Sequence, residues 1–389
     1  MAPTPTPLVE VCPVANAHNE WVALLVRGAS EAIDGATLQA LFSTPDLLDA
    51  VAPLDCIVVL DSPAVLTPSI LALLTPHRVL LAVRARALAE EGAARRVSDL
   101  QRDGFRFLLD GAAVSGVALP ASHGVARDCS ALVPVPAPAS LPPLSGPRLA
   151  YGVDSTVCFQ ACAEAGFNWF SGEYALTHLP PQSGGEDCST RKRLLTLLAL
   201  LARDADVHDL EHQLKQDPAL SYHLLKLVNS AAFTCGVEIN SFAQAIGRIG
   251  RRQLQRWLQL LLYARQHPDG PPNLLLPLAA LRGATLEALC KRDGGDRDAQ
   301  DMAFMAGVFS LLDRLFPMPM AAIVADLPLP RHVEAALLRR EGLLGQRLRL
   351  AACGRPDPAM LDAARVEAGD WWQARLHAYH WAIQVARNV

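Results

Sequence analysis

His208 and Asp209 are the only adjacent histidine and aspartate in the chain, and His212 follows four residues after His208. This spacing imitates a helical zinc site, in which two histidines bind the ion and an acidic residue is the general base. Leu210 and Leu214 take the apolar face of the same helix, which leaves the histidines on its polar face. No third ligand is evident, so we expect a solvated helix face, with no metal site and no catalytic set here.

Basic residues are unevenly distributed, because the first lysine of the chain is Lys192. Four arginines gather in one short stretch of the second half: Arg248, Arg251, Arg252 and Arg256. They alternate with leucines and Trp257 at helical spacing, so we expect the solvated face of a packed helix. A surface for an acidic protein partner is an alternative, and a nucleic-acid patch is another. The formal net charge of −4 gives no overall attraction for nucleic acid, which we do not expect to bind.

The end of the chain is rich in aromatic residues. One face of the helix expected there is apolar and should pack on neighbouring helices: Trp372, Leu376, Tyr379 and Ile383. Trp371 and Trp381 are left as candidates to anchor a partner, since exposed aromatic side chains often anchor interfaces.

The first half alternates between strand and helix patterns. Short apolar runs bounded by turn formers predict strands at residues 8–14, 21–26, 56–60, 78–83, 105–109, 116–119, 148–153 and 168–170. Helical periodicity lies between several of them, at residues 37–51, 63–74, 85–102 and 155–165. This alternation predicts a barrel or a doubly wound sheet covered by helices. The proline-rich stretch 132–147 cannot be a helix, and a complete barrel of this kind needs ~250 residues, so a barrel here would be a trimmed one.

Proline, glutamine, serine and glycine between residues 180 and 187 are typical of a linker. Almost everything after it has helical periodicity, which predicts a bundle without a sheet. We therefore divide the chain into residues 1–179, a linker at 180–190, and a helical domain at 191–389. No apolar run approaches the ~20 residues of a membrane span, no signal peptide is evident, and the nine cysteines form no CxxC pair. A cytoplasmic location is expected.

A resemblance to a known family is carried by four segments of the second half: 207–221, 224–230, 239–246 and 250–254. Together they closely resemble the HDOD domain, a relative of the HD phosphohydrolases. Active HD relatives carry a His-Asp metal doublet on one helix, and the resemblance places Ser310 and Leu311 at those two positions. A hydroxymethyl group beside a leucine cannot hold a cation that acidifies water, so the resemblance implies loss of that chemistry.

The first half resembles the EAL domain, a barrel that hydrolyses cyclic di-GMP in its active members. The resemblance covers most of residues 8–179 and rests on segments 23–27, 59–62, 104–111 and 166–172. It implies that catalytic positions are filled here by Ala23, approximately Ala82, Gly111 and Ser171. Arg27 and Asp110 persist, and the lysine of active members has no counterpart before Lys192.

Two-metal hydrolysis needs several carboxylates around cations ~3.5–4 Å apart, and one surviving aspartate does not supply them. The fold expected is thus a trimmed, degenerate TIM-like barrel of the EAL type followed by an all-helical HDOD bundle. A remnant pocket would be lined by Arg27, Asp61, Asp110 and Asp154, which are otherwise structural strand ends or surface groups.

These resemblances imply a bacterial signalling protein that is not an enzyme, needs no cofactor, and acts by contact with another regulatory protein, in processes such as motility or stress. One alternative is a receptor that binds cyclic di-GMP or another nucleotide in the remnant pocket. The other is a divergent cyclic di-GMP phosphodiesterase with a rearranged pocket.

Overall fold

The computed structural model describes residues 8–28, 32–43, 46–111, 124–130, 146–177, 185–206, 209–210, 212–213, 242–263, 273–316, 318–325 and 327–388. The chain divides into two compact units. The first comprises Met1–Thr177 with Cys353–Asp362 and Val366–Leu376, and the second comprises His178–Ala352 with Ala363–Arg365 and His377–Val389.

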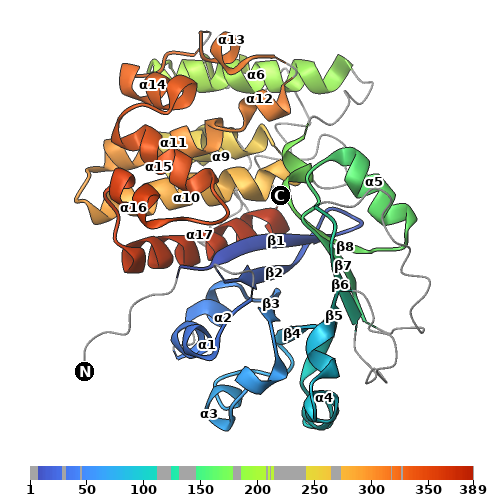
Figure 1. Ribbon diagram of the computed structural model, residues 1–389. Helices are drawn as coiled ribbons and strands as arrows, with labels where there is room; N and C mark the ends of the chain where they lie inside the picture. The colour runs from blue at the N-terminus through green and yellow to red at the C-terminus, as the bar shows by residue number, and fades with distance from the viewer. Residues whose placement is uncertain are drawn as a thin grey trace. The chain divides into compact units, whose positions relative to one another are not determined.

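Eight strands of the first unit form a closed barrel in sequence order (Figure 1). They are β1 (Glu10–Asn16), β2 (Trp21–Arg27), β3 (Asp55–Leu60), β4 (Val79–Arg84), β5 (Arg106–Asp110), β6 (Gly124–Asp128), β7 (Arg148–Tyr151) and β8 (Trp169–Ser171). Strand β1 is antiparallel to both of its neighbours, β2 and β8, and the other pairs are parallel. The predicted barrel is confirmed, and it closes over all eight strands.

Alternate residues of the strands fill the barrel with small and branched side chains. Every strand contributes to this core, whose members are Val14, Ala23, Leu25, Ala32, Ile57, Val59, Leu80, Ala82, Leu108, Ala126, Leu149 and Tyr151, with Cys12, Val22 and Trp169 packed against it. Since strand side chains alternate between two faces, the positions two residues further along each strand also face inward.

Short helices lie around the outside of the barrel (Figure 1): α1 (Gly35–Phe42), α2 (Asp46–Ala50), α3 (Pro68–Leu71), α4 (Ala93–Arg102) and α5 (Thr156–Glu164). Asp34 and Ser155 cap the N-termini of α1 and α5, because each side chain accepts a hydrogen bond from the backbone N–H three residues later in the chain. The helix predicted at 85–102 is divided into the 3-10 segment η2 (Ala85–Ala89) and α4, with Gly92 between them at φ +76°. Within the described part of the barrel, all eight strands are present and the helices that connect them are short.

Seven of the eight predicted strands coincide with observed ones within two or three residues at each end. The prediction at 116–119 lies outside the described residues, and β6 at Gly124–Asp128 was not predicted. Most of the proline-rich stretch 132–147 also lies outside them.

The described helices of the later chain are α6 (Gly185–Ala202), α9 (Phe242–Leu261), α10 (Leu275–Arg292), α11 (Arg297–Phe309), α12 (Leu312–Leu315), α13 (Met320–Ala325), α14 (Arg331–Arg339), α15 (Gly342–Ala352), α16 (Pro358–Ala364) and α17 (Ala368–Asn388). Helix α9 is interrupted at Gly250, whose φ of +77° is left-handed. Helices α10 and α11 cross backbone to backbone, because a Cβ on Gly307 would lie 2.6 Å from the Cα of Gly283.

Two features of the predicted domain division need correction. Helix α6 begins at Gly185, inside the stretch assigned to the linker, and parts of the last hundred residues group with the first unit. Sequence periodicity shows which face of a helix is apolar but not which neighbour covers it. Among the described residues, none of the helices is both long enough and apolar enough to cross a membrane.

Candidate functional site

The carboxyl end of the barrel carries a layer of polar side chains, one from each strand. Counting two residues on from the barrel core gives this inward-facing layer, which we call the mouth layer: Glu10, Arg27, Asp61, Arg84, Asp110, Asp128, Tyr151 and Ser171. Strand β1 runs in the opposite direction, so its first residue, Glu10, pairs with the last residue of β2, Arg27. Barrels of parallel strands bind ligands at this end, which makes the mouth layer the first candidate site.

Asp110 is the centre of the mouth layer, and its side chain has no exposed surface. The hydroxyl of Tyr151 donates to Asp110 Oδ1 at 2.9 Å, and Arg84 Nη1 lies 3.1 Å from Oδ2. Strand register places Arg84 opposite Asp110 across the β4–β5 pair. Burial raises the pKa of Asp110, and the charge of Arg84 and the Tyr151 hydrogen bond oppose that rise. The three side chains form one closed network, because Arg84 Nη1 also donates to the Tyr151 oxygen at 3.4 Å.

Arg27 occupies the neighbouring part of the layer. Its Nη2 lies 2.8 Å from Glu10 Oε2, and its guanidinium carbon lies 5.4 Å from the centre of the Tyr151 ring. Burial lowers the pKa of Arg27, but the nearby acidic groups, Glu10 foremost, outweigh it and leave the pKa raised. Arg27 therefore stays charged, and it is linked to Asp110 through Tyr151.

Three of the four residues predicted to line a remnant pocket meet here. Arg27 and Asp110 contact Tyr151, and Asp61 Oδ1 lies 4.0 Å from Arg84 Nε. Asp154 is exposed and lies beyond the end of β7, outside the mouth layer. Sequence reasoning missed four members of the layer: Glu10, Arg84, Asp128 and Tyr151. Counting in steps of two along the predicted strands would have found Glu10, Arg84 and Tyr151, whereas Asp128 lies on β6, which was not predicted.

Three of the positions that the EAL resemblance marks as emptied lie in the described strands of the barrel. Ala23 and Ala82 are fully buried in the barrel core, and Ser171 is buried in the mouth layer. Among the described residues, no group of three or more histidine, cysteine, aspartate or glutamate side chains is arranged to hold a metal ion. Both oxygens of Asp110 already face Arg84 and Tyr151. The donor set of the described barrel end therefore does not fit a pair of metal ions.

In the second unit, the two positions predicted to replace a metal doublet are buried. Ser310 ends α11, and its hydroxyl donates to the Gly307 carbonyl at 2.7 Å and accepts from Arg282 Nη1 at 3.1 Å. Leu311 is buried beside it. The hydroxyl thus caps a helix and satisfies a buried arginine. Asp209 and His212 are exposed, and His208 lies outside the described residues.

The predicted arginine surface is not a simple solvated face. Arg256 Nη1 donates to Glu287 Oε1 at 2.9 Å, and its guanidinium lies 4.2 Å from the centre of the Phe304 ring. Arg252 pairs with Asp298 and Asp301, and Arg251 Nη2 donates to the Ala205 carbonyl at 2.6 Å. Arg248 lies in α9, and its side chain is outside the described part. These arginines bind groups of their own unit because neighbouring helices present carboxylates to them.

The two predicted aromatic anchors are also engaged. Trp371 is 5% exposed, and the guanidinium of Arg375 lies 5.3 Å from its ring centre. Trp381 is half-buried and packs edge-on against Phe304, with ring centres 5.4 Å apart. Trp371 is therefore buried, contrary to the expectation of an exposed anchor.

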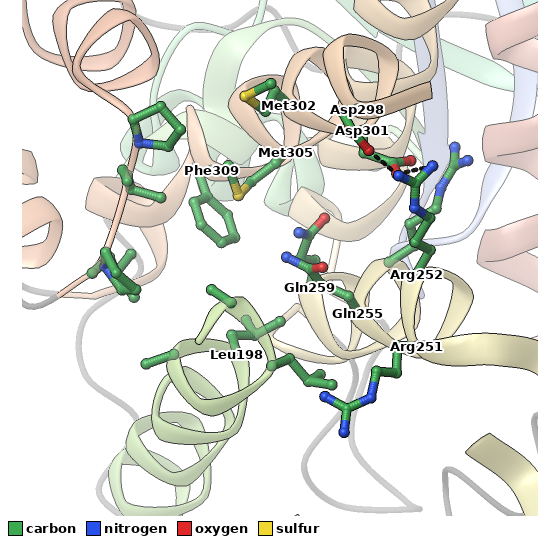
Figure 2. Close-up of a pocket in the computed structure, with 18 of the residues that line it drawn as sticks. Leu198, Arg251, Arg252, Gln255, Gln259, Asp298, Asp301, Met302, Met305 and Phe309 are labelled. Carbon is green, nitrogen blue, oxygen red and sulfur yellow. Dashed lines mark hydrogen bonds and ion pairs between the residues drawn. The ribbon is translucent and has the colours of Figure 1, made fainter. Parts of the chain in front are cut away.

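The arginine stripe of α9 borders a cavity of about 340 Å³ in the second unit (Figure 2). Residues from α6, α9, α11 and the segment Leu327–Pro330 line it. It lies within the size range of small-molecule pockets, ~300–1,000 Å³. It is the second candidate site, and the polar side chain of Gln259 is buried in its wall.

Comparisons with known proteins match a family model to one part of the chain. The family model described as HDOD domain matches residues 190–317. Cyclic di-GMP phosphodiesterase CdgJ of Vibrio cholerae is 30% identical over 191 residues, 48% of this chain and 44% of that protein. YuxH of Bacillus subtilis is 27% identical over 206 residues, 52% of this chain and 49% of that protein. The chain thus spans about half the length of the curated relatives it matches.

Solved structures similar to this chain include EAL domains. One is a phosphodiesterase named PaMucR in complex with c-di-GMP, 15% identical, with a TM-score of 0.34, covering 42% of this chain and 93% of that one. Another is a standalone EAL protein of Vibrio cholerae in its c-di-GMP-bound form, 16% identical, with a TM-score of 0.33, covering 43% and 90%. At these scores the likeness carries no inference about activity.

One prediction from the sequence is overturned by these findings. The chain was expected not to be an enzyme, whereas its relative CdgJ is named a cyclic di-GMP phosphodiesterase, which points to an enzyme. The loss of individual side chains from a known motif is thus insufficient to exclude activity. Residues 190–317 match the HDOD domain model, and they follow a closed eight-stranded barrel in the order that the sequence predicted.

Proposed function

We propose that this chain acts in cyclic di-GMP signalling and that its barrel binds the dinucleotide at the mouth layer. The observation that carries the proposal is the pair of guanidinium groups, Arg27 and Arg84, on the inner face of the barrel end. Their side chains are 16% and 18% exposed, so a ligand reaches them from solvent, whereas Asp110 is fully covered. The name of the relative CdgJ supports cyclic di-GMP as the ligand.

Guanidinium groups suit this ligand because they match phosphate oxygens with two parallel N–H donors. Cyclic di-GMP has two phosphodiesters, and each bears one negative charge. In the unbound barrel the two arginines are held in fixed positions by Glu10 and Asp110. Binding therefore requires an exchange of partners, from a carboxylate to a phosphate. Tyr151 lies between the two arginines, where its buried ring packs against Arg27 and its hydroxyl contacts Arg84, so it fixes their positions without itself reaching the ligand.

Isothermal titration calorimetry with cyclic di-GMP tests the proposal. Hydrogen bonds to charged groups contribute about 1.5–3 kcal/mol, so Arg27→Gln and Arg84→Gln should each weaken binding by roughly tenfold to a hundredfold. Titrations run with and without magnesium and manganese, so that any contribution of a divalent cation to binding is measured directly. Chromatography of the same samples for the linear dinucleotide decides whether bound ligand is hydrolysed.

The matched control is Arg102→Gln on α4, an exposed arginine paired with Asp99 on its own helix. It should bind cyclic di-GMP as the unmodified protein does. Circular dichroism melting of every variant separates lost binding from lost folding. The proposal fails if the unmodified protein shows no binding heat, or if folded Arg27 and Arg84 variants bind as tightly as the control.

The partner expected from the sequence, another signalling or regulatory protein, stays a prediction. The residues proposed for that surface are engaged within their own units where the structure describes them. A pull-down experiment with each domain separately tests whether such a partner binds and which domain binds it.

A further inference from the structure

The second half of α9 is divided into two faces with different neighbours. Leu254, Leu258 and Leu261 are buried on one face, together with Trp257. The other face carries polar residues at successive helical turns: Arg251, Arg252, Gln255, Arg256 and Gln259. All five line the cavity of about 340 Å³. The stripe runs from the exposed Arg252 to the buried Gln259, so its buried end faces the cavity and could contact a ligand there.

The remaining walls of this cavity are largely apolar. Helix α11 contributes Met302, Met305 and Phe309, α6 contributes Leu198, and the segment Leu327–Pro330 completes the lining. Figure 2 shows the two glutamine amides in the middle, with the methionines and Phe309 on one side and Arg251 on the other. The cavity thus combines an apolar slot with a carboxamide edge.

A bound ligand would explain why the side-chain oxygen of Gln259 is buried without a hydrogen-bond partner. It is 2% exposed, and its Oε1 has no hydrogen-bond partner among the described residues. A buried polar atom without a partner costs about 1–3 kcal/mol, so such atoms are rare in interiors. Oε1 is an acceptor only, so the missing partner is an N–H or O–H group.

The charges of the residues that line the cavity indicate whether its ligand is charged or neutral. Arg251, Arg252 and Arg256 are balanced by Asp204, Asp298 and Asp301. Arg252 pairs with two of these aspartates, Arg251 lies 3.9 Å from Asp204, and Arg256 pairs with Glu287. A charged ligand gains little from a lining whose charges cancel. An aliphatic ligand would leave Gln259 Oε1 unsatisfied.

We propose that this cavity binds a neutral, flat heterocycle with adjacent N–H and C=O groups, of which the guanine base is the model. The N–H donates to Gln259 Oε1, the C=O accepts from a glutamine N–H of the Gln255/Gln259 pair, and the ring packs against Met305 and Phe309. Gln255 and Gln259 are one turn apart on the same face, which brings both carboxamides to one edge of the ligand. The site is separate from the mouth layer and does not depend on the function proposed for it.

Three nucleosides of nearly equal size test the pairing. Guanosine and inosine have the N–H beside C=O, and purine riboside has neither group. In saturation-transfer NMR and calorimetry with the full chain, guanosine and inosine should bind and purine riboside should bind at least about tenfold more weakly. Equal binding of purine riboside, or no binding of guanosine and inosine up to about 1 mM, would overturn the proposal.

Gln259→Leu removes the acceptor with little change of volume, and Gln373→Leu, at an exposed position of α17, is its matched control. Gln259→Leu should abolish guanosine binding and raise the melting temperature of the ligand-free protein. Gln373→Leu should change neither. A folded Gln259→Leu variant that still binds guanosine contradicts the assignment.

A second variant tests whether the ligand binds inside the cavity. Ala199 lines it from α6, so Ala199→Phe should fill the slot and block guanosine while Gln259 is unchanged. Arg84→Gln in the barrel should leave guanosine binding intact, so the two proposals fail separately. Guanosine binding that survives Ala199→Phe locates the ligand elsewhere and refutes the site.

Discussion

The mouth layer of the barrel and the cavity beside α9 both bring arginines and acidic or amide groups together, but they satisfy them differently. In the mouth layer, the carboxylate of Asp110 is held by Arg84 and Tyr151, and Glu10 by Arg27. In the cavity, the arginines are paired while a deeply buried amide oxygen, Oε1 of Gln259, is left without a partner. The first is a network of ion pairs with its arginines near solvent, and the second surrounds an open volume and leaves an uncharged buried acceptor without a hydrogen bond.

This difference determines how each site would take a ligand. A ligand of the mouth layer must compete with internal ion pairs, so its affinity depends on charge and on salt. A ligand of the cavity completes a missing hydrogen bond and fills apolar space, so its affinity depends on shape and on one donor. Substitutions at the two sites should therefore change stability in opposite directions.

The largest effect is expected from Arg84→Met. The substitution leaves the carboxylate of Asp110 buried without its ion-pair partner, which costs about 3–5 kcal/mol of the free energy of unfolding. Urea denaturation followed by circular dichroism measures the loss. Arg86→Met, in which an arginine that is 79% exposed is replaced, should change it by less than about 0.5 kcal/mol. Equal effects of the two substitutions would show that the mouth layer is not a coupled network.

Gln259→Leu should have a smaller effect of opposite sign. It replaces a buried acceptor that has no partner among the described residues with an apolar group of similar size. The free energy of unfolding should rise by about 1 kcal/mol in the same urea experiment. A loss of stability would mean that Gln259 is satisfied in solution, and the contrast between the two sites would then disappear.

The smallest effect is a pH dependence that originates at Asp110. Burial raises its folded-state pKa above the unfolded value of about 3.9, so the folded chain binds this proton more tightly. The stability that results is fully present below the unfolded pKa and is lost as pH rises through the folded pKa. Asp110→Asn should remove this decline, measured as the free energy of unfolding in urea between about pH 3.5 and 7. Asp154→Asn, at an exposed position, is the control. An unchanged slope in Asp110→Asn would assign the decline to other groups.

Local patterns were sufficient for most of the elements. The strand at 56–60 was recognised because consecutive branched residues are buried on both faces, and it is observed at Asp55–Leu60. The helix predicted at 155–165 likewise follows from its periodicity and is observed at Thr156–Glu164. Strand β6 was missed because GVARD has only two branched or apolar residues before its charges. Its pairing with β5 and β7 supplies what its own sequence lacks.

The candidate sites were only partly accessible from the sequence. Arg27 and Asp110 were found, but the tyrosine that joins them comes from β7, 41 residues after Asp110. The arginines of α9 were interpreted as a solvated face, because periodicity separates polar from apolar sides without showing what lies opposite the polar side. Gln259 was not singled out, since a glutamine between leucines gives no signal of an unsatisfied acceptor.

The sequence by itself determined the alternation of strands and helices, the helical second part, the HDOD resemblance and the absence of lysine before Lys192. These properties depend on neighbours along the chain, and side-chain periodicity records them. Closure of the barrel, the partners of each arginine and the cavity beside α9 were decided only by the tertiary structure. They depend on distances between residues far apart in the chain, which are fixed when buried polar groups and apolar surfaces are satisfied together.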